Sequence, residues 1–187
     1  MESLEDLFEE TLRDIYYTEK TILKALPKMA KKASSEQLAD AFSEHIEQTE
    51  GQVARLEQIF EMIGKAARGK RCPAMDGLVE EATELMQEAK DETVRDAGML
   101  AAAQAVEHYE ISRYGTLAAW AGKLGMTEAA ELLQATLEEE KDTDAKLSEL
   151  ALSEINIAAD NENEDAVSGQ KSRSRKRSGD ASSQARR

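Results

Sequence analysis

The chain has 187 residues, a formal net charge of −14 and one cysteine. A chain of this length normally forms one domain with a single core, and a lone cysteine excludes an internal disulfide. No apolar run approaches the ~18 residues of a membrane span, and the N-terminus is acidic rather than signal-like. We therefore expect a cytoplasmic protein without a membrane partner.

Helix is the only regular structure that the composition favours. The chain has 10 Gly and only 2 Pro, and it is rich in Ala, Leu, Glu and Lys, so we expect an all-α fold. Apolar residues recur at three- and four-residue spacing, as in amphipathic helices. In chain order, this spacing predicts helices over about 3–32, from a cap at 34–36 to Gly64, over 78–89, over 91–123 and over 127–155.

The connections between these helices predict the topology. Few residues join the first long helix to the second or the third to the fourth, so each pair should form an antiparallel hairpin. The join between the two pairs is nearly thirty residues long and contains the short helix over 78–89. Two hairpins linked by one long crossover are typical of a ferritin-like four-helix bundle. We assign this bundle to residues 1–155.

Residues 156–187 form a predicted disordered tail that is first acidic and then basic. From Lys171 onward the chain carries seven Lys and Arg against Asp180, a net charge of +6, so the preceding 170 residues carry −20. Such a tail buries too little apolar surface to fold. It either binds nucleic acid weakly and without sequence preference, or it is a solubilising extension.

Carboxylates interrupt the apolar stripes of three predicted helices. They are Glu19 in the first long helix, Glu107 and Glu110 in the third, and Glu140 in the fourth, where Asp144 follows one turn later. A carboxylate on a core face is costly unless it is protonated, paired with a cation or bound to a metal. Helical bundles that repeat this arrangement usually hold divalent metal, whereas Tyr16, Tyr17, Tyr114, Arg55 and Arg113 are the partners available for a metal-free pairing.

Several motifs resemble those of the ferritin-like YciF/YciE proteins. They are YTEK at 17–20, HIEQT at 45–49, CPAMDG at 72–77, QAVEHYE at 104–110, YGTL at 114–117 and LEEEK at 137–141. The similarity covers about residues 4–151 and leaves the basic tail outside. It implies a ferritin-like bundle, a homodimer, a dinuclear metal centre and a stress-associated role, but no defined small-molecule substrate.

The ligand set departs from the ferritin-like pattern, which takes one Glu from each of two helices and Glu-x-x-His from each of the other two. Glu19 and Glu107 match the single-Glu positions. Three residues after Glu140 stands Thr143 rather than His, so Asp144 is the expected substitute. On the second helix the inward stripe carries Thr49, with His45 and Gln52 on its flank, while Glu47 and Glu50 point away from the core; His45 is the ligand that we predict there. The predicted metal ligands are Glu19, His45, Glu107, Glu110, Glu140 and Asp144.

We therefore expect a stress-response protein that binds one or two iron or manganese ions, because hard carboxylate oxygens suit both metals. Any enzymatic activity would be at most a slow oxidation of iron or consumption of peroxide. Two alternatives stay open: a metal-free dimeric bundle with a structural or interaction role, and a DNA-associated protector that uses the basic tail.

Overall fold

The computed structural model describes residues 1–160, and most of the predicted tail lies outside this range. All regular secondary structure in the described part is helical: α1 (Leu4–Lys32), α2 (Glu36–Met62), α3 (Pro73–Glu88), α4 (Glu92–Lys123), α5 (Thr127–Leu150) and the π-helical turn η1 (Ala151–Ile155). Residues 156–160 continue in α-helical conformation. The predicted all-α fold is confirmed.

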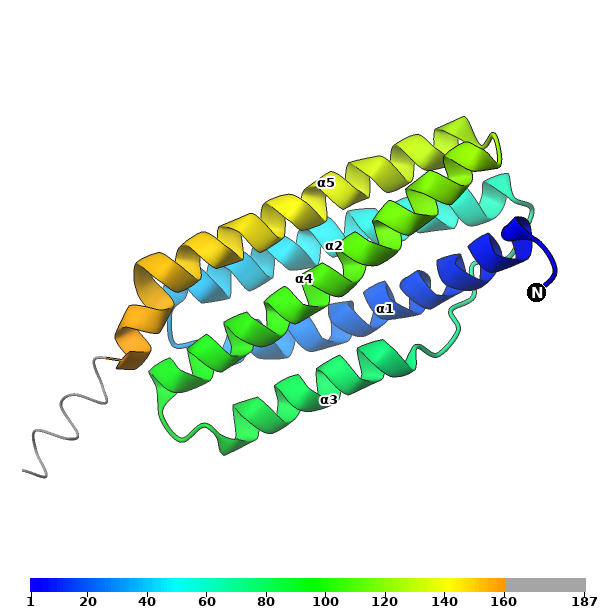
Figure 1. Ribbon diagram of the computed structural model, residues 1–187. Coiled ribbons are helices and arrows are strands. Elements are labelled where there is room, and N and C mark those ends of the chain that lie inside the picture. The colour runs from blue at the N-terminus through cyan, green and yellow to red at the C-terminus, as the bar shows by residue number, and fades with distance from the viewer. Residues whose placement is uncertain (161–187) are drawn as a thin grey trace, which may run out of the picture.

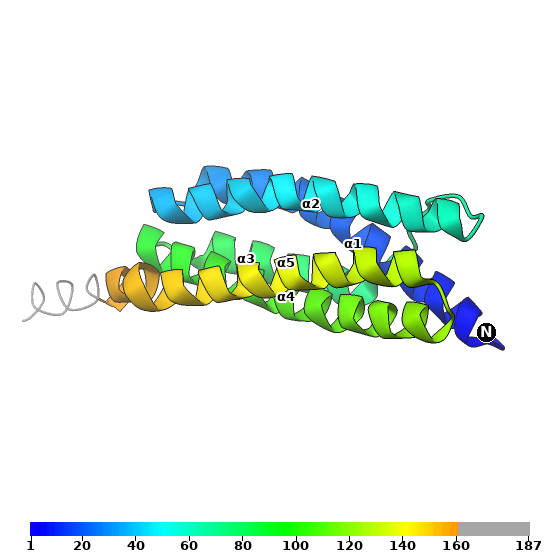
Figure 2. The same ribbon diagram turned by 90° about the horizontal axis from the view of Figure 1, so that it is seen from above.

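Helices α1, α2, α4 and α5 form a bundle of two antiparallel hairpins (Figure 1). Helix α1 packs on α2 and α4, and α5 packs on α2 and α4. The two hairpins are seen as two layers in Figure 2. The long crossover carries α3, which runs along the outside of the bundle next to α4 and α1.

Helix α3 begins earlier than the apolar spacing predicts. It starts at Pro73, because Cys72 caps it: the Cys72 thiol accepts a hydrogen bond from the backbone N–H of Met75. Proline is favoured in the first turn of a helix, where its missing N–H has no partner to lose. The periodicity misses this turn because Met75 is the only residue of α3 that is fully buried.

The core consists of two apolar halves with a polar layer between them. One half contains Ile22, Leu26, Phe42, Leu100 and Leu147, and the other contains Leu12, Ile15, Ile59, Leu117 and Leu133. On each of the four bundle helices the buried apolar residues give way to buried polar ones at the same depth. This layer is where the predicted site lies.

No helix in residues 1–160 is long and apolar enough to cross a membrane.

Candidate metal centre

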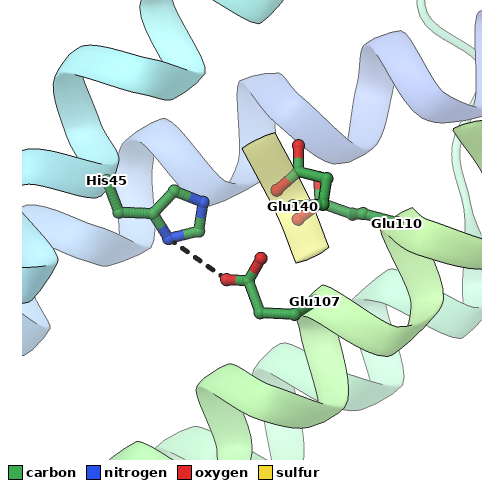
Figure 3. Close-up of side chains that lie close together, drawn as sticks. All are labelled: His45, Glu107, Glu110 and Glu140. Carbon is green, nitrogen blue, oxygen red and sulfur yellow. Dashed lines mark ion pairs between the residues drawn. The ribbon is translucent and has the colours of Figure 1, made fainter. Parts of the chain in front are cut away.

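Four side chains from three helices converge in the polar layer (Figure 3). His45 comes from α2, Glu107 and Glu110 come from α4, and Glu140 comes from α5. One ligand atom from each of the four lies within 4.8 Å of the others. We call these four residues the carboxylate cluster.

Helical periodicity brings these groups together. Glu107 and Glu110 are three residues apart on α4, and Tyr114 follows four residues later, so all three share one face. Glu140 stands between Leu137 and Leu147 on the inward face of α5, and all of these residues are buried. The apolar residues above and below anchor both helices, and this packing holds the carboxylates inside the bundle.

The cluster carries polar atoms that no group of the described chain satisfies. Both carboxylate oxygens of Glu107, Glu110 and Glu140 are buried without a hydrogen-bond donor. Nε2 of His45 is also buried and has no hydrogen-bond partner. The three glutamates are 0% exposed. Buried polar groups in native proteins almost always have partners, so these atoms mark a site that needs protons or a cation.

Burial has a large effect on the acidity of these groups. Desolvation, with the charge of the neighbouring carboxyls added, raises the pKa of Glu107 to about 8 and raises the pKa values of Glu110 and Glu140 well above the usual range. Without metal, the three carboxyls therefore hold protons at neutral pH. Glu107 lies close enough to Glu140 for the two carboxyl groups to share one proton.

His45 is buried and neutral. Burial lowers its pKa to about 4. Its Nδ1 lies 3.3 Å from Oε1 of Glu107, the contact that is dashed in Figure 3. Because Glu107 keeps its proton near pH 7, this contact joins two neutral groups there. A neutral imidazole is the form that binds a metal ion.

Glu19, from α1, borders the cluster and is also 0% exposed. The hydroxyl of Tyr114 donates a hydrogen bond to Oε1 of Glu19, while Oε2 has no partner. Desolvation raises the pKa of Glu19 to about 7, although the Tyr114 hydrogen bond opposes this rise. Glu19 also lies within hydrogen-bond reach of Glu110, with which it can share a proton.

Asp144, by contrast, lies outside the cluster. It is half-buried, and its carboxylate faces Nε2 of the exposed His108 at 3.3 Å. The buried residue at this turn is Thr143, whose hydroxyl donates to Oε1 of Gln48 at 3.1 Å. The six predicted ligands therefore divide into the group of four, a neighbour (Glu19) and Asp144, which faces His108 although its Oδ1 is buried and its charge contributes to the raised pKa of Glu107.

The cations and phenols that might have neutralised the buried glutamates mostly pair with other groups. Arg55 binds Glu139, Arg113 lies near Asp14, Tyr16 donates to Glu57 and Tyr17 donates to Asp76. Of the five tyrosines and arginines considered as partners, only Tyr114 donates a hydrogen bond to a buried glutamate, Glu19. Within residues 1–160, no Lys or Arg forms an ion pair with Glu19 or with a glutamate of the cluster.

Two further polar groups of this layer were not among the predicted ligands. Oγ1 of Thr18 and Oε1 of Gln52 are buried without a partner. Thr18 follows Ile15 by three residues and precedes Ile22 by four, so the spacing of the apolar residues in α1 predicts that Thr18 faces into the bundle. The burial of Gln52 is harder to predict from the sequence, because its amide nitrogen also donates a hydrogen bond, at 3.4 Å, to Glu139 at the edge of the bundle.

Comparison with known proteins confirms the resemblance that the motifs predict. A family model described as a domain of unknown function (DUF892) matches residues 3–160. Protein YciF of Escherichia coli K12 is 47% identical over 162 residues, which cover 86% of this chain and 98% of YciF.

Solved structures agree with this assignment. The crystal structure of the E. coli stress protein YciF matches with a TM-score of 0.80 and 47% identity, covering 83% of this chain and 99% of that one. YcfI from Rhodopseudomonas palustris matches with a TM-score of 0.77 and 48% identity, covering 79% of this chain and 94% of that one. The chain belongs to the family described as DUF892.

Proposed function

We propose that this protein is a ferritin-like stress-response protein that binds one or two iron or manganese ions in its carboxylate cluster. The observation that carries the proposal is the group of buried atoms without partners: six carboxylate oxygens and one imidazole nitrogen, all in one layer. A divalent cation would satisfy these atoms and remove the repulsion among the carboxylates.

The donor chemistry favours iron or manganese. Three carboxylates and one imidazole are hard and intermediate ligands, whereas softer metals prefer thiolates. Cys72, the one cysteine of the chain, is buried away from the cluster and contacts the hydroxyl of Tyr109. His45, Glu107, Glu110 and Glu140 would hold the first ion, and Glu19 would serve a second.

The surrounding residues would control access and geometry. The apolar halves of the core exclude bulk water from the cluster, and Tyr114 orients Glu19 through its hydroxyl. A redox-active ion bound there would supply one-electron chemistry toward oxygen or peroxide. The stress-associated role rests on the relative that is described as a stress protein.

A metal-free structural bundle is the second candidate, and one observation favours it. The raised pKa values mean that the buried carboxyls can stay neutral by holding protons, and the pairs Glu19–Glu110 and Glu107–Glu140 lie close enough to share them. In that case the layer is a network of carboxyl hydrogen bonds and has no affinity for metal.

A manganese titration separates these candidates. The resonance signal of free aqueous Mn(II) is followed as metal is added to the protein. The Glu107→Ala, Glu140→Ala variant should lose tight binding. The matched variant Glu92→Ala, Glu131→Ala removes two exposed carboxylates from the same two helices and should bind like the wild type. Equal binding by all three proteins would assign the metal to the surface and contradict the proposal.

A further inference from the structure

A pocket of about 90 Å³ lies beside the carboxylate cluster, between α3 and the bundle. Its walls come from α1, α3 and α4 and are almost wholly apolar: Ile22, Met29, Val79, Ala82, Ala103 and Val106 are among them. Two polar side chains, Lys28 and Thr83, also line it, and both are exposed at its rim.

The pocket reaches two members of the cluster. His45 and Glu107 are among its lining residues, and Nε2 of His45 and both oxygens of Glu107 are buried without a hydrogen-bond partner. The pocket therefore ends against two residues of the candidate metal centre, whose polar atoms are themselves closed to a water-sized molecule.

Helix α3 covers this space loosely. Only Met75 of α3 is fully buried, whereas Leu78, Val79 and Met86 are half-buried against the bundle. Leu85, on the same helix, is 40% exposed. Figure 1 shows that α3 lies outside the four long helices, although its Met75 belongs to the apolar core. Elements with few buried contacts open at low free-energy cost.

The size and polarity of the pocket restrict what it can hold. An apolar cavity of about 150 Å³ binds benzene, so a space of 90 Å³ suits a molecule of only a few heavy atoms. Water and hydrogen peroxide need several hydrogen-bond partners, and apolar walls make their transfer costly. Dioxygen is small and apolar, and it loses little on leaving water.

We propose that this pocket binds dioxygen and admits it to the carboxylate cluster from the side covered by α3. The proposal rests on the proposed function, since it names the small molecule that the metal site would meet. It concerns binding alone and is testable in the metal-free protein.

The test uses full-length, metal-free protein and two gases. Xenon, an apolar probe of similar size, should shift the methyl resonances of Val79 and Val106. Dissolved dioxygen is paramagnetic and should speed the relaxation of the same methyl groups several times more than that of Leu12 and Ile59, which lie in the other half of the core.

Substitutions on α4 provide a matched pair. Ala102 lines the pocket, so Ala102→Leu should fill it and abolish both effects, whereas Ala101→Leu, at the exposed neighbouring position, should preserve them. Ala82→Leu fills the pocket from α3 and gives a second variant if Ala102→Leu fails to fold. Xenon and oxygen effects at Val79 and Val106 no larger than those at Leu12 and Ile59 would overturn the proposal, and so would effects that survive both filling variants. Manganese titration of the same proteins shows separately whether the metal site itself fails.

Discussion

Glu110 is the residue at which burial and charge act most clearly together. Its carboxyl is 0% exposed, and neither oxygen has a donor. Desolvation and the neighbouring carboxyls Glu19, Glu140 and Glu107 raise its pKa well above 4.5. The folded, metal-free protein therefore keeps a proton that the unfolded chain releases above about pH 4.5.

The first prediction is a fall in the stability of metal-free protein as pH rises. Where the folded state binds more protons than the unfolded state, the free energy of unfolding decreases with pH, by about 1.4 kcal/mol per pH unit for each proton. The fall should begin near pH 4.5 and continue to about pH 8, where Glu107 loses its proton. His45 acts in the opposite direction, since its lowered pKa removes stability as pH falls from 6.5 toward 4.

Urea unfolding between pH 6.5 and 8 isolates the carboxyl contribution. In this window Glu110→Gln should flatten the slope by up to about 1.4 kcal/mol per pH unit, because glutamine does not titrate. Glu131→Gln, at an exposed position of α5, should leave the slope unchanged. If both variants keep the wild-type slope, Glu110 is ionised in the folded protein and the assigned proton is absent.

The second prediction separates the two histidines of the chain. His45 is 4% exposed and belongs to the cluster, whereas His108 is exposed and faces Asp144. Removing a group that merely orients a metal ligand costs about 10- to 100-fold in affinity, so His45→Ala should weaken manganese binding at least tenfold. His108→Ala should have no effect. Equal affinities for all three proteins, measured by competition with a metal indicator, would exclude His45 as a ligand.

At the scale of the helices, the sequence predicts much of the architecture but only part of the site. Periodicity predicts all five helices. It also predicts that Glu19, Glu107, Glu110 and Glu140 face inward, because they lie on the same helix faces as the buried apolar residues. It cannot predict that Thr143 rather than Asp144 is buried at the next turn of α5. These residues differ by one position, and the packing between helices decides which of them faces inward.

The pocket under α3 was also beyond sequence reasoning. Periodicity within each helix predicts which face is apolar, but not how closely two apolar faces approach. Helix α3 presents half-buried residues to α1 and α4, and the space that remains depends on their packing. Sequence periodicity also cannot predict what holds the turn between α1 and α2, because the residue that accepts its backbone hydrogen bonds lies on α4, about sixty residues away.

The third prediction concerns that turn. Asp96 of α4 is 2% exposed and accepts hydrogen bonds from the backbone N–H groups of Ser34 and Ser35, at 3.0 and 2.7 Å, and from the Ser34 hydroxyl, at 2.6 Å. Asp96→Ala leaves these donors unsatisfied and should lower the free energy of unfolding by about 3 kcal/mol. Asp91→Ala, which removes the cap of α4, should cost only about 1 kcal/mol. Urea titrations should show this order, and equal losses would mean that Asp96 does not hold the turn.

At the scale of the whole molecule, the polar layer interrupts the core at the cost of carboxyl desolvation, and a bound cation would offset that cost. Ligands must lose their protons before they bind metal. The fourth prediction is therefore a manganese-induced rise in melting temperature that is larger at pH 8 than at pH 6. An excess of one hundred times the dissociation constant stabilises the folded state by about 2.7 kcal/mol.

The Glu107→Ala, Glu140→Ala variant should lose this rise at both pH values, whereas Glu92→Ala, Glu131→Ala should keep it. A rise that is independent of pH, or that is equal in the two variants, would indicate binding to exposed carboxylates and not to the polar layer.

The most direct measurement of the central claim is a crystal structure of the protein grown with Mn(II), with anomalous diffraction recorded at the manganese edge. The account predicts one or two anomalous peaks inside the bundle, within coordination distance of donor atoms of His45, Glu107, Glu110 and Glu140. Peaks confined to surface carboxylates at saturating manganese, with the buried carboxyls still paired with one another, would contradict it.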